Sequence, residues 1–156
     1  MVTFEIPDFG RCGIAHLVFD YNGTLACDGN LIKNVRERLI ELSKQFTIHV
    51  ITADTFGNVR KQLEAIPCKL SILPARDQAL AKEAYVIQTG AHQTVALGNG
   101  RNDRLMLRKA VIGIAVLQTE GAAGETILHA DIVVKSITDA LELLQHPLRL
   151  KATLRS

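Results

Sequence analysis

The chain has 156 residues, 47% of them hydrophobic and 22% charged, which is ordinary for one globular domain. Its formal net charge of +2 is too small to indicate binding to nucleic acid or to a membrane surface. The three cysteines, Cys12, Cys27 and Cys68, form no CxxC pair, so neither a disulfide framework nor a zinc site is suggested. We expect a cytoplasmic protein with no signal peptide and no membrane span, because acidic residues interrupt the N-terminal apolar residues and every apolar run is short.

Short apolar runs alternate with amphipathic stretches along the chain. Residues 15–19 predict a buried strand ending at Asp20, and residues 21–30, rich in Gly, Asn and Asp, predict a loop or small hairpin. A helix is expected to begin near Asn34, with Asn34 as its N-cap and Glu37 as the capping-box partner. Further along, we expect strands over residues 46–51, 70–73, 94–97, 112–116 and 131–134, and helices near residues 59–66, 75–89, 102–109 and 136–144.

This order of elements is typical of a mostly parallel sheet with helices on both faces. We therefore predict a single α/β domain over residues 1–147, in three α/β/α layers. Residues 148–156 form a basic C-terminal tail that we expect to fray. Ligands of such sheets bind beyond the carboxyl ends of the strands. Asp20, Thr52 and Asn99 each follow an apolar strand, so we expect them to meet at one edge.

Asp20 is the first residue whose position suggests chemistry. A carboxylate at a strand end, beside the glycine-containing loop of residues 21–25, is placed to attack phosphorus and form an aspartyl-phosphate. The loop amides and the Thr24 hydroxyl could then hold the phosphoryl oxygens. The competing interpretation is an aspartate that only caps the loop, because strand-to-loop aspartates are common.

The second polar segment is residues 98–103, Gly-Asn-Gly-Arg-Asn-Asp. A carboxylate and two amides follow an apolar strand here, and they could complete an oxygen-only site for Mg²⁺. The alternative is a helix N-terminus at which Asn102 and Asp103 are simply favoured residues. Lys82 could neutralise the nucleophile and the phosphate, although most helical lysines are only solvated. Thr52 could donate a hydrogen bond to a phosphoryl oxygen, or could simply be a polar strand end.

The candidate residues occur along the chain in the order Asp20, Thr52, Lys82 and residues 99–103. This ordered set resembles the haloacid dehalogenase superfamily of aspartate-based phosphotransferases, over about residues 17–144. The sequence is most similar to the phosphorylation domain of P-type ATPases. Residues 20–25, Asp-Tyr-Asn-Gly-Thr-Leu, resemble their Asp-Lys-Thr-Gly-Thr-Leu, and residues 52–54, Thr-Ala-Asp, resemble their Thr-Gly-Asp. Residues 95–103 resemble their hinge motif. Only about thirty residues separate the first two motifs, which is too few for the nucleotide-binding domain inserted in the pumps.

The resemblance implies a Rossmann-like fold with a minimal cap, in which residues 27–31 are the only flap. It implies a Mg²⁺-dependent phosphatase or phosphotransferase that acts on a small phosphorylated substrate. Partner subunits often close the site of related capless enzymes, so a homo-oligomer, either a dimer or a tetramer, is a further expectation. The resemblance assigns the nucleophile to Asp20, further catalytic positions to Asn22, Thr52 and Lys82, substrate binding to Gly23, Thr24 and Ala53, and Mg²⁺ to Asp20, Asn22, Asn99 and Asp103.

Two positions depart from the family pattern. Family phosphatases usually carry a second aspartate two residues after the nucleophile, which protonates the leaving group and later activates water; here that position is Asn22. An amide cannot shuttle a proton near neutral pH, and losing such help typically costs about 10²- to 10⁴-fold in rate. Asn99 replaces an aspartate that usually binds magnesium, so we expect weaker metal binding. We predict a slow phosphatase, and a degenerate phosphate-binding or interaction protein of the same fold stays open.

Overall fold

Six parallel strands form the central sheet of the computed structural model, which describes residues 2–155. The sheet order is β10-β9-β8-β3-β6-β7, and each neighbouring pair runs parallel. Its central strands are buried along almost their whole length, as expected for a sheet covered on both faces. The predicted α/β class with a mostly parallel sheet is therefore confirmed. The strands are β3 (His16–Asp20), β6 (Thr47–Thr52), β7 (Cys68–Ile72), β8 (Thr94–Gly98), β9 (Ile112–Val116) and β10 (Ile132–Val134).

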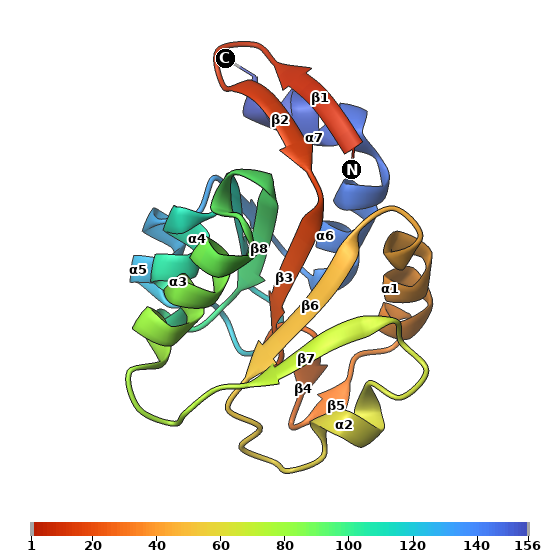
Figure 1. Cartoon of the computed structure of the whole chain (residues 1–156), viewed down its shortest axis with the longest axis vertical. Helices are drawn as coiled ribbons and strands as arrows, with labels where there is room; N and C mark the ends of the chain where they lie inside the picture. The colour runs from red at the N-terminus through yellow and green to blue at the C-terminus, as the bar shows by residue number, and fades with distance from the viewer. Residues whose placement is uncertain (1, 156) are drawn as a thin grey trace.

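Helices cover both faces of the sheet and produce the expected three layers (Figure 1). Successive side chains of a strand point to opposite faces. In β3, Leu17 and Phe19 accordingly pack in the core shared with α1 and α6, whereas Val18 packs in the core shared with α3 and α4. No helix within residues 2–155 combines the length and the apolar character needed to cross a bilayer. The helices are α1 (Val35–Ser43), α2 (Val59–Gln62), α3 (Gln78–Thr89), α4 (Arg104–Lys109), α5 (Gly124–Leu128), α6 (Ile137–Gln145) and α7 (Pro147–Leu154), with short 3₁₀ helices η1 (Ala91–Gln93) and η2 (Arg101–Asp103).

The strand register brings three polar strand ends to one edge of the sheet. Asp20 on β3 pairs with Ile51 on β6, and Phe19 pairs with Leu97 on β8. Because the strands are parallel, residues that follow them leave the sheet on the same side. The small hairpin of β4 (Ala26–Cys27) and β5 (Asn30–Leu31) lies at this end of the molecule, where a loop or hairpin was predicted (Figure 1).

A second hairpin lies at the opposite end of the sheet and was not predicted from the sequence. It consists of β1 (Val2–Ile6) and β2 (Gly10–Ile14), and α7 packs against it (Figure 1). The expectation of a fraying tail at residues 148–156 is wrong over most of that segment, because α7 extends to Leu154 and buries Leu150. Burial of this side chain against the hairpin supplies the contact that a free tail would lack.

The expected cap of the first helix is also wrong. Asn34 does not cap α1 with its side chain; it adopts a left-handed backbone conformation with φ of 67°. The amide of Val35 donates instead to the carbonyl of Ile32, so a turn leads into the helix. The reason lies in the backbone, because residues that cap a helix N-terminus are usually extended, whereas Asn34 is left-handed.

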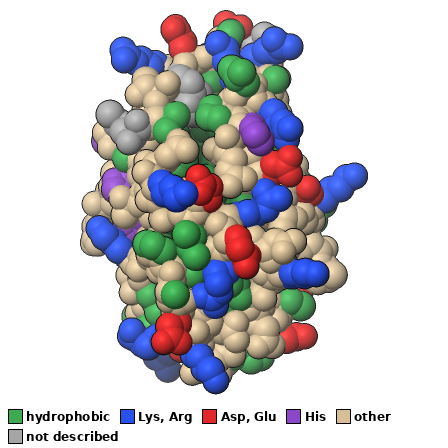
Figure 2. Space-filling model, turned by 90° about the vertical axis from the view of Figure 1, so that its right-hand side faces the viewer, with side chains coloured by type: hydrophobic (Ala, Val, Ile, Leu, Met, Phe, Trp, Pro, Cys, Tyr) green, Lys and Arg blue, Asp and Glu red, His purple; other side chains and the backbone are tan. Residues whose placement is uncertain are grey.

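The molecular surface on the α1 side carries interspersed charges of both signs (Figure 2). Arg38 on α1 and Arg149 on α7 both pair with Glu142 on α6. Such exposed ion pairs are screened by water, so they link the helices without dominating stability.

The contact between β9 and α4 requires a glycine at position 113. A Cβ atom added to Gly113 would lie 2.5 Å from the backbone oxygen of Leu107. We expect Gly113→Ala to lower the free energy of unfolding by about 1–3 kcal/mol, because the helix backbone would have to move. Urea denaturation measures this loss. Gly124→Ala is the matched control, since its Cβ would meet nothing within 4 Å; equal stability of the two variants would contradict the prediction.

Candidate active site

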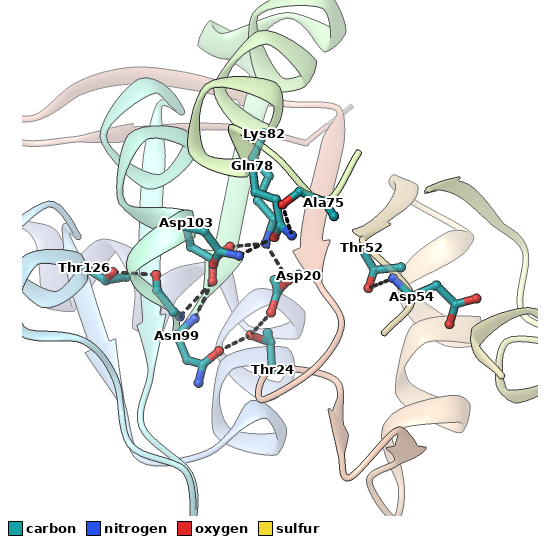
Figure 3. A network of polar contacts seen from close by, with 12 residues as sticks. Asp20, Thr24, Thr52, Asp54, Ala75, Gln78, Lys82, Asn99, Asp103 and Thr126 are labelled. Carbon is teal, nitrogen blue, oxygen red and sulfur yellow. Dashed lines mark hydrogen bonds and ion pairs between the residues drawn. The ribbon is translucent and has the colours of Figure 1, made fainter. Parts of the chain in front are cut away.

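Lys82 lies between two carboxylates at the centre of the polar edge (Figure 3). Its Nζ is 2.6 Å from Asp20 Oδ1 and 2.6 Å from Asp103 Oδ1. Lys82 is 1% exposed and Asp103 is fully buried, so these ion pairs differ from the screened pairs of the surface. The ammonium group of Lys82, on α3, thus joins the end of β3 to the segment that follows β8.

Burial and neighbouring charge shape the protonation of this cluster. Burial, and secondarily the charge of Asp103, raise the pKa of Asp20 to about 7 in the metal-free protein. Burial alone would lower the pKa of Lys82, but the charges of Asp20 and Asp103 outweigh it and raise that pKa above its ordinary value. Lys82 therefore stays positively charged, and a further cation beside Asp20 would favour its ionised, nucleophilic form.

Asp103 organises the loop after β8 through its second oxygen. Asp103 Oδ2 accepts hydrogen bonds from the amides of Asn99 at 3.0 Å and Gly100 at 2.9 Å. The absence of a side chain at Gly98 makes room, because a Cβ there would lie 2.5 Å from Asp103 Cγ. Both oxygens of Asp103 are thus engaged, one by Lys82 and one by the backbone, so this residue holds the loop beneath the pocket.

Thr24 connects the nucleophile loop to Asn99. Its hydroxyl lies 3.3 Å from Asp20 Oδ2 and 3.4 Å from Asn99 Oδ1, and its single proton can be donated to one of them at a time. The amides of Gly23 and Thr24 donate to the carbonyls of Ala26 and Tyr21 inside the loop. The loop amides expected to hold phosphate are therefore already used at these two positions, because the turn closes on itself.

A pocket of about 220 Å³ opens above Asp20. The predicted site residues Thr52 and Ala53 lie on its wall, whereas Gly23, Thr24, Lys82 and Asp103 are not among the residues that line it. Thr52 Oγ1 accepts a hydrogen bond from the amide of Asp54 at 3.0 Å, which orients the hydroxyl. The lining consists of Asp20, Asn22, Thr52, Ala53, Thr55, Gln78, Asn99, Gly100, Asn102 and Glu120.

The oxygen atoms around this pocket fit a divalent cation such as Mg²⁺. Asp20 contributes a carboxylate, and Asn22 and Asn99 contribute amide oxygens to the lining. The side-chain oxygen of Asn22 is buried and has no hydrogen-bond partner within residues 2–155. A buried oxygen without a partner is costly, and a hard cation is one group that would satisfy it. Sulfur and imidazole ligands are absent from the lining within the described residues.

Two residues at this site were missed by the sequence analysis. Gln118 donates from Nε2 to the carbonyls of Gly23 at 3.1 Å and Thr24 at 2.6 Å, and so braces the nucleophile loop. Glu120 lines the pocket itself. Both follow β9, so the strand-end rule that selected Asp20 and Asn99 could have found them.

Removing the positive charge of Lys82, which lies between the two carboxylates, is expected to destabilise the fold. Lys82→Met should lower the free energy of unfolding by about 3 kcal/mol, because two buried carboxylates would face each other without a counter-charge. The loss should grow as the pH rises, since a carboxyl group whose pKa is raised on folding favours the fold only while protonated. Urea denaturation at pH 6 and pH 8 measures both effects. Lys44→Met, which breaks an exposed pair with Glu41, should cost less than about 1 kcal/mol; a similarly small loss for Lys82→Met would contradict the prediction.

The fold is that of the haloacid dehalogenase phosphatases. The cobalt-bound deoxy-D-mannose-octulosonate 8-phosphate phosphatase of Haemophilus influenzae matches with a TM-score of 0.67 and 16% identity, over 88% of this chain and 91% of that one. A phospho-aspartyl intermediate analogue of phosphoserine phosphatase matches with a TM-score of 0.66 and 16% identity, over 86% and 99%. The 3-deoxy-D-manno-octulosonate 8-phosphate phosphatase of Moraxella catarrhalis, in complex with a magnesium ion, a phosphate ion and a KDO molecule, matches with a TM-score of 0.61 and 17% identity, over 84% and 85%.

Sequence relatives are found in Methanocaldococcus jannaschii. The uncharacterized protein MJ0073 is 57% identical over 61 residues, which are 39% of this chain and 66% of that protein. The uncharacterized protein MJ0072 is 41% identical over 39 residues, which are 25% of this chain and 89% of that protein. This chain therefore belongs to the same family as MJ0072. No protein-family model matches the chain.

Proposed function

We propose that this protein is a Mg²⁺-dependent phosphatase or phosphotransferase that acts through an aspartyl-phosphate at Asp20. The observation that carries the proposal is the bridge of Lys82 between Asp20 and Asp103 beneath an oxygen-lined pocket. A buried lysine held by two carboxylates places positive charge directly under the point where a phosphoryl group would bind. The likeness in fold to a phosphatase captured as a phospho-aspartyl analogue supports the same chemistry here.

In the proposed reaction, a carboxylate oxygen of Asp20 forms a bond to phosphorus while the bond to the leaving group breaks. Thr52, on the pocket wall, donates a hydrogen bond to a phosphoryl oxygen, and Lys82 orients the carboxylate and favours its ionised form. Bound Mg²⁺ would supply charge neutralisation for the phosphoryl group. Water then attacks phosphorus and releases phosphate, which regenerates Asp20.

Asn22 narrows the class of substrate. Its amide lines the pocket at the position where the family resemblance expects a proton-transferring aspartate, and it cannot protonate a departing alkoxide. Substrates with leaving groups that need no proton, such as acyl phosphates, are therefore favoured. The pocket of about 220 Å³ suits a phosphoryl group with a small leaving group.

Acid-quenched trapping tests the proposal. The protein is incubated with ³²P-labelled acetyl phosphate and Mg²⁺, quenched in acid and separated by electrophoresis. We expect an acid-stable label that hydroxylamine removes, as an acyl phosphate requires. An unlabelled wild-type protein would contradict the proposal.

The second candidate is a phosphate-binding or interaction protein that has kept the fold without turnover. The observation that favours it is the pair of amides at Asn22 and Asn99, which removes a proton donor and a metal charge from the pocket. Calorimetric binding of fluoroberyllate or vanadate, together with no label and no hydrolysis of any tested phosphate, would support this candidate over the first.

A further inference from the structure

Glu120 adds a second carboxylate to the wall of the pocket. It lines the cavity together with Asp20, Asn22 and Asn99. A Cβ atom built on Gly23 would lie 2.8 Å from Glu120 Oε2 and 2.7 Å from Asn99 Oδ1. The Glu120 carboxylate and the Asn99 amide therefore flank the same point above the nucleophile loop.

Hydrogen bonds fix the segment that carries Glu120. On one side, Gln118 binds the carbonyls of Gly23 and Thr24 with its side chain. On the other side, the Asn99 side chain donates to the Gly121 carbonyl at 3.1 Å, and the Ala123 amide donates to the Asn99 carbonyl at 2.8 Å. Glu120 lies between these anchors, so the tertiary structure holds its backbone beside the pocket.

The charges around Glu120 favour a cation. Within residues 2–155, no hydrogen bond or ion pair engages its carboxylate, and the Asp28 carboxylate and Cys27 Sγ lie within 4.8 Å of it. Lys82, the cation beneath the pocket, is already shared by Asp20 and Asp103. Asn99 offers an oxygen without charge at the position where the family resemblance expects a carboxylate. The pocket wall thus combines the uncharged oxygen of Asn99 with the neighbouring carboxylate of Glu120, which has no counter-charge within residues 2–155.

We propose that Glu120 supplies the bound divalent cation with the negative charge that Asn99 lacks, as an oxygen ligand direct or through one water. The inference rests on the proposed function, because it concerns the cation of that same site. Glu120 and Asn99 then act as one unit, in which the amide provides geometry and the carboxylate provides charge. A cation ligand from the loop after β9 also explains why that loop is tied to both the nucleophile loop and Asn99.

Binding of Mn²⁺, followed by electron paramagnetic resonance without substrate, tests this inference. We expect Glu120→Gln to weaken binding by about tenfold, the lower end of the loss seen when supporting groups are removed from metal sites. Glu125→Gln is the matched control, because Glu125 lies further along the chain in α5, outside the pocket lining, and pairs with Arg101 at 3.0 Å. Its affinity for Mn²⁺ should stay within about twofold of wild type.

A compensating change sharpens the test. Asn99→Asp returns a carboxylate to the neighbouring position, so the double variant Asn99→Asp with Glu120→Gln should recover the affinity lost by Glu120→Gln alone. Circular dichroism and thermal unfolding confirm that each variant is folded. Wild-type affinity in folded Glu120→Gln, or no recovery in the double variant, would overturn the inference.

If the proposed function is wrong, the Mn²⁺-binding measurements give a different pattern from the one expected when only the role of Glu120 is wrong. In that case wild type binds no Mn²⁺, or Asp20→Asn binds it as tightly as wild type, and the inference about Glu120 fails with it. If wild type binds Mn²⁺, Asp20→Asn loses the binding and Glu120→Gln keeps it, only the role of Glu120 is refuted.

Discussion

Asp20→Asn is expected to abolish the acid-stable label and to lower turnover of acetyl phosphate by about 10⁴- to 10⁶-fold, the scale seen when a covalent nucleophile is removed. The carboxamide has the same shape but lacks the nucleophilic oxygen. Lys82 would still pair with Asp103 at 2.6 Å, so the cluster keeps a partner for its buried cation. Quenched-flow labelling and a steady-state phosphate-release assay measure the two effects.

A stability measurement shows whether the Asp20→Asn variant has lost only its chemistry or also its fold. Burial raises the pKa of Asp20, which means that its ionised form is disfavoured by the folded state. Asp20→Asn should therefore be at least as stable as wild type above pH 7. Asp77→Asn is the control for the substitution itself, since Asp77 is exposed, precedes α3 and lies outside the pocket lining. Residual labelling of the Asp20→Asn protein would show that another residue accepts the phosphoryl group.

Asn22→Asp is expected to raise turnover by about 10²- to 10⁴-fold, the usual contribution of a general acid and base. The gain should depend on the leaving group. Alkyl phosphates need a proton on departure and should gain most, whereas acyl phosphates should gain mainly through faster attack of water on the intermediate. The level of trapped label should consequently fall as hydrolysis accelerates. A panel of substrates with graded leaving-group pKa values measures this dependence.

A matched control for this gain is Asn58→Asp. Among the described residues 2–155, the side-chain oxygen of Asn58 is also buried without a partner, but Asn58 precedes α2 and lies outside the pocket lining. A new carboxylate there should leave turnover unchanged. If Asn22→Asp and Asn58→Asp behave alike, while phosphate analogues still bind to the wild type, the phosphate-binding candidate becomes the better description of this protein.

Much of the fold could be predicted because its signals are local. Buried strands of a parallel sheet appear as short apolar runs, and residues 112–116 were predicted with the bounds that β9 has in the structure. The β1–β2 hairpin escaped prediction because the apolar residues of Gly10–Ile14 are few and its burial depends on α7, which comes from the other end of the chain. Asn34 failed as a cap because its backbone is left-handed, whereas a capping residue is usually extended.

The candidate site, like the fold, could be predicted from the sequence only in part. Asp20 and Asn99 were found because both follow apolar strands, and parallel strands deliver such residues to one edge. Glu120 was not among the site residues predicted from the sequence, because its neighbours Gly23 and Asn99 are close to it only in space. The assigned roles of these residues stay predictions until the variants above are measured.

The sequence alone determined which polar groups the chain can offer and at which strand ends they emerge, because side-chain type and periodicity are local properties. Only the tertiary structure decided that Lys82 is buried between Asp20 and Asp103, and that Glu120 lies beside Asn99. Those contacts depend on strand register, on the placement of α3 over the sheet and on the anchored loop after β9. The physical reason is that the charge state and the reactivity of a carboxylate follow from burial and from neighbours that are remote in the chain.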